Sequence, residues 1–172
     1  KARRFKDYRV MFDQMSHRID AVTISTPDHM HFHPAMQAIQ AGKHVFCQKP
    51  LTHTVWEART LTEAARKAGV ATQMGNQGIS SPRMRQDAAI VRAGILGDIL
   101  EMHCWSDRPG GRWKQGIERP SGSPQVPDHI DWDLWIGCAP WRPYHPAYHP
   151  FAWRGFWDFG TGAIGDMGCH LL

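Results

Sequence analysis

The sequence predicts an α/β protein whose first half is built on a parallel sheet. Three short, β-branched apolar runs, residues 20–26, 43–48 and 70–75, are separated by two stretches in which apolar residues recur at helical spacing. This β-α-β-α-β alternation is typical of parallel strands joined by right-handed crossovers. Ligands bind such sheets at the carboxyl ends of the strands, which are residues 25–29, 48–50 and 75–78.

The helices are predicted from apolar residues at helical spacing and from capping residues at their ends. Residues 33–41 carry an apolar stripe and are followed by Gly42, a residue typical of helix C-termini. The next helix is capped by Thr52 or Thr54 and ends at Gly69. A further helix over 80–93 has a serine cap with Pro82 just inside it and ends at Gly94.

The second half has a different character. Residues 97–106, GDILEMHCWS, alternate like an antiparallel strand, which places a domain change between residues 77 and 97. We therefore expect a first domain over 1–78 and the beginning of a second over 79–172. Seven of the eight tryptophans fall in a stretch at 105–157 that is rich in Pro and Gly and has no period, which predicts a long ordered loop. A last helix is predicted from about residue 163.

Composition excludes several classes of protein. Hydrophobic residues make up 42% and charged residues 21%, which is typical of a folded globular protein. The net charge of +4, with acids interspersed, argues against nucleic acid as a partner. No apolar run approaches the roughly 20 residues of a membrane span. The four cysteines form no C-x-x-C pair, so no metal site is expected from them.

The C-terminal stretch GTGAIGDMGCHLL has two interpretations. Gly160, Gly162 and Gly165 match the G-x-G-x-x-G of a dinucleotide phosphate loop, but the preceding WRGFWDF is a poor buried strand. Asp166 and His170 are four residues apart, so on a helix they share a face as a catalytic pair or as an ordinary surface pair. A carboxylate beside an imidazole suits a general base, and we favour the helix interpretation.

Other candidates lie in the loops. Lys49 follows the second strand, where an ammonium can polarise a substrate oxygen. His29, His31 and His33 alternate as metal ligands do in a strand, but their place at a helix entry favours loop packing. The acids of DHIDWD, residues 128–133, are interpreted as turn or cap residues. Trp153 and Trp157 with the intervening Arg154 suit a sugar platform with a charged clamp, or loop packing.

Taken together, STPDHMHFHPAMQAIQAGKHVFCQKPL and GTGAIGDMGCHLL resemble the glucose-fructose oxidoreductase and inositol dehydrogenase family, Gfo/Idh/MocA. The resemblance implies a Rossmann domain, a doubly wound parallel sheet, followed by an α+β domain with an open antiparallel sheet. It also implies NAD or NADP as cofactor, a sugar or polyol as substrate, hydride transfer at a CH–OH carbon, and a homo-oligomer formed through the sheet of the second domain.

The resemblance also implies roles for individual residues. Lys49 would orient the substrate hydroxyl, His170 would remove its proton, and Asp166 would contact substrate and tune His170. The cofactor side would be lined by Ser25, Thr26, Pro27, His29 or His31, Gln48 and Lys49, with Gln48 standing where the family usually has Glu. The expected substrate residues are Asn76, Gln77, Trp153, Arg154 and Trp157.

The family's first strand and phosphate loop have no counterpart in the sequence, so the chain is interpreted as an internal fragment whose phosphate loop preceded Lys1. The expected compartment is the cytoplasm, or the periplasm if an export signal preceded the chain. Three alternatives to a dehydrogenase remain at this stage. They are an NAD-dependent, redox-assisted glycosidase of the same family, a non-catalytic sugar or cofactor binder and, least favoured, a metal-dependent hydrolase.

Overall fold

A three-stranded parallel sheet forms the centre of the computed structural model, which describes residues 2–171. Its strands are β1 (Ala21–Ile24), β2 (His44–Gln48) and β3 (Thr72–Gly75), arranged in that order. The register sets Ala21 opposite His44 and Val45 opposite Thr72. The parallel α/β prediction is therefore confirmed, with each strand slightly shorter than its apolar run.

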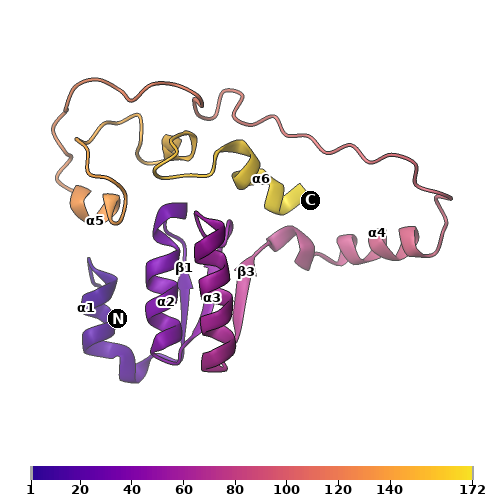
Figure 1. Ribbon diagram of the computed structural model, residues 1–172, viewed down its shortest axis with the longest axis horizontal. Coiled ribbons are helices and arrows are strands. Elements are labelled where there is room, and N and C mark those ends of the chain that lie inside the picture. Colours follow the sequence, from indigo (N-terminus) through magenta and orange to yellow (C-terminus); the bar gives the residue numbers. More distant parts are fainter. Residues whose placement is uncertain (1, 172) are drawn as a thin grey trace.

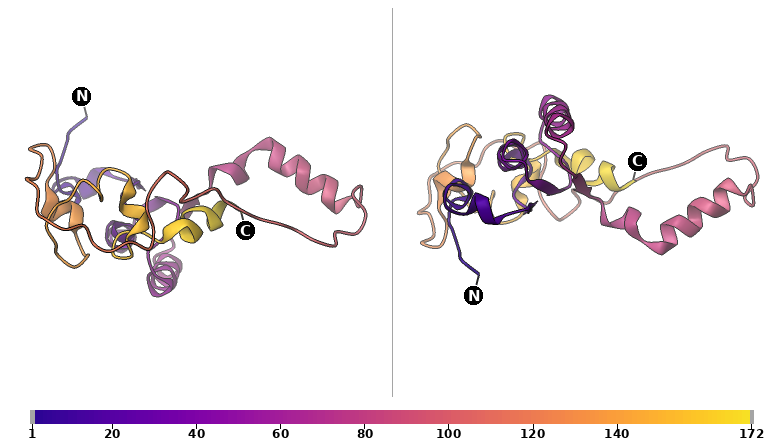
Figure 2. Two further views of the ribbon diagram at one scale, coloured as in Figure 1. Left: turned by 90° about the horizontal axis from the view of Figure 1, so that it is seen from above. Right: turned by 90° about the horizontal axis from the view of Figure 1, so that it is seen from below.

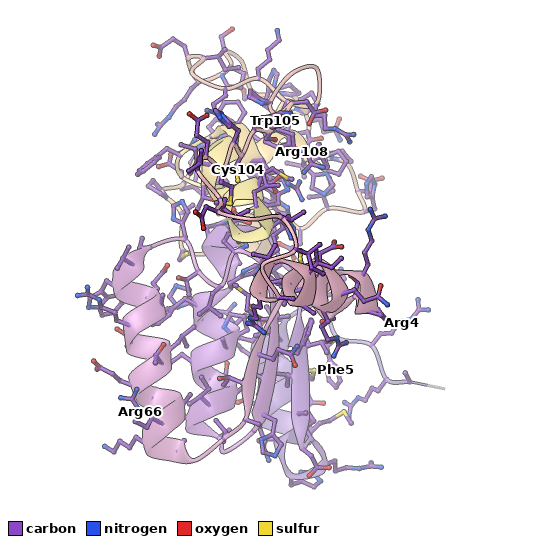
Figure 3. The ribbon with its side chains drawn as sticks, turned by 90° about the vertical axis from the view of Figure 1, so that its right-hand side faces the viewer. Arg4, Phe5, Arg66, Cys104, Trp105 and Arg108 are labelled. Atoms are coloured by element: carbon purple, nitrogen blue, oxygen red, sulfur yellow. The ribbon has the colours of Figure 1, made fainter. Side chains whose placement is uncertain are left out.

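Two helices, α2 (Phe32–Gln40) and α3 (Val55–Ala68), lie side by side on one side of the strands (Figures 1 and 3). Their apolar faces pack on the sheet, and the buried residues of the helices and strands form one hydrophobic cluster. That cluster consists of Phe12, Ile24, Ala35, Ala38, Ile39, Val45, Cys47, Leu61 and Ala65. Phe12 belongs to α1 (Tyr8–Met15), which precedes β1.

The ends of α3 follow from its sequence. Thr54 is the N-cap: its hydroxyl accepts the Glu57 N–H, while the Glu57 carboxylate accepts the Thr54 N–H. Gly69 ends the helix at φ +66°, a conformation that L side chains rarely adopt. Of the two caps that the sequence offered, Thr54 is the one used.

The remaining elements are α4 (Pro82–Arg92), α5 (Trp132–Ile136), α6 (Gly162–Leu171) and 3₁₀ turns at Ser16–Arg18, Asp28–Met30, Gln77–Ser80 and Ala152–Gly155. Helix α4 has no buried residue, and Figures 1 and 2 show it extending away from the sheet. No helix among residues 2–171 is long and apolar enough to cross a membrane.

The strand predicted over 97–106 is absent, and this prediction is wrong for the described chain. These residues have exposed side chains and no strand beside them, and the described residues contain no antiparallel pairing. Alternating sequence alone cannot hold an extended segment as a strand, because its backbone groups need a neighbouring strand with which to form hydrogen bonds.

The tryptophan-rich segment folds around an aromatic cluster of its own. The buried members are Trp132, Ile136, Tyr144, Tyr148, Trp153, Phe156 and Phe159. Trp132 stacks on Trp135 with ring centroids 4.8 Å apart, and its indole N–H donates to the Arg142 carbonyl at 2.7 Å. The segment is ordered by aromatic packing, which a period in the sequence does not reveal.

His29 joins this aromatic cluster to the sheet. Its backbone N–H donates to the Phe159 carbonyl at 3.3 Å, and its ring nitrogens lie 3.3 Å from that oxygen and 3.2 Å from the Trp135 carbonyl. The residue is 2% exposed, and burial lowers the pKa of its ring to about 4. The ring is therefore neutral at physiological pH.

We expect this neutral histidine to make folding sensitive to acid. The unfolded chain binds a proton at His29 below pH 6.5, whereas the folded chain binds it only near pH 4, so stability falls between these values, by up to about 3 kcal/mol. The melting temperature of the intact gene product should fall less steeply from pH 7.5 to 4.5 in His29→Gln. The exposed His17→Gln serves as the control and should keep the original slope.

Candidate active site

A cavity of about 430 Å³ opens where the loops after β1 and β2 meet α6 and the tryptophan-rich segment. Its floor comes from the carboxyl ends of two parallel strands, the usual place for a ligand on such a sheet. The lining consists of Ser25, Thr26, Pro27, Asp28, Gln48, Lys49, Trp135, His149, Pro150, Phe151, Trp153, Arg154 and Asp166.

An ion pair between Lys49 and Asp166 is the central contact of this cavity. The Lys49 ammonium donates to Asp166 Oδ1 at 2.8 Å and to the Asp166 backbone carbonyl at 2.6 Å. The two side chains are 16% and 5% exposed, so water screens the pair only in part. Residues that are 117 positions apart in the chain are thus brought together at the end of β2.

Two arginines bind the same carboxylate. Arg108 donates to Asp166 Oδ2 at 2.7 Å and Arg154 Nε to Oδ1 at 3.2 Å. Burial raises the pKa of Asp166, but hydrogen bonds from Lys49 and Arg108 and the charges of Lys49 and Arg154 outweigh it, so the pKa lies below its ordinary value. Figure 3 shows Arg108 beside α6, above the strands. Asp166 is therefore an ionised anchor for three cations.

His170 is not a partner of Asp166. Both lie on α6, but no hydrogen bond or ion pair joins them, and His170 is not among the residues that line the cavity. The expectation that Asp166 orients His170 is corrected by the structure, because Lys49, Arg108 and Arg154 occupy both carboxylate oxygens. His170 itself is half-buried, one helical turn farther along.

The glycines of GTGAIG shape the turn into α6. Gly160 has no room for a side chain, because a Cβ there would lie 2.6 Å from the Arg154 Cα. Gly162 has φ +65°, a backbone conformation that L side chains rarely adopt. Thr161 between them donates its N–H and its hydroxyl to Asp28 Oδ2, at 3.3 and 3.0 Å. The turn is thus fixed to the loop after β1, and no strand leads into it as a phosphate loop requires.

Two buried histidines, His29 and His31, lie in the segment that follows β1. His31 is 1% exposed, and its ring nitrogens lie 2.7 Å from the Pro50 carbonyl and 2.8 Å from the Thr26 carbonyl. His31 thus joins the loop after β1, at Thr26, to the loop after β2, at Pro50. The two rings do not line the Lys49 cavity. Residues 2–171 contain no group of three His, Cys, Asp or Glu side chains placed to hold a metal ion.

Of the site residues expected at the ends of β2 and β3, Gln48 lines the cavity, whereas Asn76 and Gln77 lie outside its lining. The Gln48 side-chain amide packs against Gly75. A Cβ on Gly75 would lie only 2.8 Å from Gln48 Oε1. The Gln77 side-chain amide donates to Gln48 Oε1 at 3.1 Å. The Asn76 side-chain oxygen is buried and has no hydrogen-bond partner among residues 2–171.

The two tryptophans expected to hold a sugar face different surroundings. Trp153 is buried and lines the cavity beneath Arg154, whose guanidinium carbon lies 4.3 Å from the ring centroid. Trp157 is 85% exposed and lies near His53, beside a second cavity. The two rings therefore do not form one platform, and only Trp153 belongs to the Lys49 cavity.

Sequence reasoning missed three residues that form the polar contacts of this site, and also Trp135, His149, Pro150 and Phe151 in its lining. Arg108 lies 58 positions before Asp166 in a segment with no period, so no local pattern relates them. Asp28 and Thr161 sit beside predicted motifs, but their contact spans 133 positions. Pro27 before Asp28 marks a loop at a strand end, and this was the one available signal for Asp28.

The contact between Arg108 and Asp166 predicts a measurable pKa change. Arg108→Gln should raise the pKa of the Asp166 carboxyl, because it removes a hydrogen bond and a positive charge that both lower it. A ¹³C NMR titration of side-chain carboxyls measures this, with the Asp166 signal identified by its loss in Asp166→Asn. Arg119→Gln removes a guanidinium from Asp158 instead and should leave the midpoint unchanged. An identical midpoint in Arg108→Gln would contradict the contact.

Comparison with known proteins covers both halves of the chain. Residues 1–76 match the model described as Oxidoreductase family, NAD-binding Rossmann fold, and residues 82–172 match the corresponding C-terminal alpha/beta domain. The levoglucosan dehydrogenase of Pseudarthrobacter phenanthrenivorans is 26% identical over 99% of the chain, which spans 37% of that protein.

Solved structures of oxidoreductases match a little more than half of the chain. An inositol dehydrogenase homolog from Azotobacter vinelandii, in complex with NADH and myo-inositol, is 36% identical with a TM-score of 0.53, over 55% of this chain and 26% of that one. The WlbA dehydrogenase from Bordetella pertussis, in complex with NADH and UDP-GlcNAcA, is 26% identical with a TM-score of 0.50, over 54% and 28%. With both of its halves matched, the chain belongs to the Gfo/Idh/MocA family of NAD-binding oxidoreductases.

Proposed function

We propose that the intact gene product transfers a hydride between a CH–OH carbon of a sugar or cyclitol and NAD or NADP. The observation that carries this proposal is the Lys49 ammonium, fixed by Asp166 at the carboxyl end of β2 and facing a cavity. The chain spans about a third of the curated relatives' length, so the experiments below use the intact gene product.

The cavity residues fit one side of a dinucleotide. Ser25, Thr26, Gln48 and Lys49 place hydroxyl, amide and ammonium donors around the ends of β1 and β2, which is the ligand edge of a parallel sheet. These residues would hold the nicotinamide half, and the bound cofactor would supply the hydride acceptor. Their donors suit ribose hydroxyls and a carboxamide.

Lys49 is suited to hold the substrate oxygen. An ammonium has three N–H donors, and Lys49 directs two of them to Asp166, one to the side chain and one to the backbone carbonyl. The third remains for a hydroxyl in the cavity. As the hydroxyl becomes a carbonyl, a fixed positive charge stabilises the negative charge that develops on its oxygen.

His170 is the proposed proton acceptor. Oxidation of a CH–OH group releases a hydride from carbon and a proton from oxygen, and the proton needs a base. His170 lies one helical turn beyond Asp166 on the same helix, outside the lining of the cavity, so this role rests on the family resemblance of GTGAIGDMGCHLL. Since Asp166 is bound by cations, the role of Asp166 in this proposal is to position Lys49.

The relatives support a carbohydrate substrate. One is named as a levoglucosan dehydrogenase, another as a 1,5-anhydro-D-fructose reductase, and one structural neighbour holds NADH with myo-inositol. All three ligands are rings that carry hydroxyl groups. We therefore assign this chemical class, a cyclic polyol, to the cavity.

Replacing Lys49 should abolish most activity. Lys49→Met removes the donor to the substrate oxygen and should lower kcat by about 100-fold or more. The assay follows reduced nicotinamide at 340 nm across a panel of sugars and cyclitols. Lys67→Met, on the exposed end of α3, is the matched control and should retain activity. Full activity in Lys49→Met would reject the proposal.

Replacing His170 tests the base. His170→Ala should lower kcat by roughly 100-fold to 10,000-fold, the usual contribution of a general base. Unchanged kcat would show that another group accepts the proton. Cleavage of an aryl glycoside without net accumulation of reduced cofactor would instead identify the redox-assisted glycosidase.

A further inference from the structure

We infer that the Lys49 cavity takes an anionic sugar, one that bears a carboxylate as a hexuronate does, and that Arg154 binds this carboxylate. The inference deepens the proposed function and rests on it for the identity of the reaction.

The charges around the cavity are not balanced. Lys49, Arg108 and Arg154 all bind the single carboxylate of Asp166. Asp28, the other acid in the lining, is already bound by Thr161, and burial raises its pKa. The lining itself holds two cations, Lys49 and Arg154, and the two acids. Arg108, bound to Asp166 from outside the lining, adds a third positive charge against these two carboxyls.

The three cationic side chains are only 16%, 26% and 22% exposed, so water solvates them incompletely. His149, the histidine in the lining, has its pKa lowered by burial and supplies no charge at neutral pH. Partly buried charges are stabilised by pairing, and the unbalanced charge here is positive. A ligand with a negative charge therefore complements the cavity better than a neutral one.

Arg154 is held in a fixed orientation at the cavity wall. Its Nε donates to Asp166 and its Nη1 donates to the Phe151 carbonyl at 3.0 Å. Its guanidinium carbon lies 4.3 Å from the ring centroids of both Phe151 and Trp153. Two hydrogen bonds and two aromatic rings thus restrain a side chain that otherwise has many rotamers.

One nitrogen of this guanidinium remains available. Arg154 Nη2 has no hydrogen-bond partner among residues 2–171, and Arg154 lies between the Lys49 cavity and the second cavity beside Trp157, lining both. A restrained guanidinium with unused N–H groups is well suited to a carboxylate, whose two oxygens match its planar donors. Arg108 binds Asp166 but does not line the cavity, so its role is to add charge.

The anion that Arg154 binds has two chemical sources, the carboxylate of a sugar substrate and the phosphates of the cofactor. The phosphates of a dinucleotide are anions of the same general kind, and both sources would satisfy Arg154. The two are separated by measuring affinity for NAD⁺ and discrimination between sugars independently.

The experiment compares matched sugars on the intact gene product. The probes are D-glucose with D-glucuronate and D-galactose with D-galacturonate, each tested for kcat/KM with NAD⁺ and for binding by calorimetry. We expect at least a 10-fold preference for the uronate in one pair. Arg154→Gln should reduce that preference by about 10- to 100-fold, the usual effect of losing a hydrogen bond to a charged group.

Two further variants separate recognition from structure. Arg154→Lys keeps the charge but loses the planar donors, and should retain part of the preference. Arg83→Gln removes the same charge from the exposed face of α4 and should change nothing. Because the readout is the ratio between two sugars, a general loss of activity in Arg154→Gln does not count as support.

Several results would overturn the inference. Neutral sugars used as well as uronates would do so, as would equal losses for both sugars in Arg154→Gln. A fall in NAD⁺ affinity with an unchanged sugar preference would assign Arg154 to the cofactor, and absence of binding by any of the four probes would also reject the inference. Arg154-dependent binding of a uronate without oxidation would support the inference and reject the proposed function.

Discussion

The contact between Lys49 and Asp166 is the constraint on which the rest of the site depends. Lys49 directly follows strand β2 of the parallel sheet, and Asp166 lies on a helix 117 positions later. The ammonium binds both the side chain and the backbone carbonyl of Asp166, so it fixes the position of the helix as well as that of the carboxylate. The cavity exists because these two parts of the chain meet at this point.

Three further contacts hold the same two parts together. His29 binds the Phe159 carbonyl, Asp28 binds Thr161, and the His53 ring lies 3.3 Å from the Gly160 carbonyl. Their partners are successive residues just before α6. This stretch is thus fixed at each of three positions before the helix begins, which limits how far Asp166 can move relative to Lys49.

The predictable part of the structure is the part with local signals. The parallel strands followed from short apolar runs, and the capping box at Thr54 and the left-handed Gly69 fixed one helix. The strand over 97–106 failed because alternation predicts a strand only where a partner strand exists. Arg108 and the partners of Asp166 were beyond prediction, since contacts across 58 and 117 positions leave no pattern in the sequence.

Stability alone does not explain why one carboxylate binds three cations. A partly buried ion pair gains little over well-packed apolar residues, because removing charges from water costs about as much as their attraction returns. The arrangement is better explained by preorganisation: Asp166 binds Lys49 and Arg154, two cations that line the cavity, and so restrains both side chains before a ligand arrives. Groups fixed before the ligand arrives need little reorganisation when charge develops on a substrate oxygen.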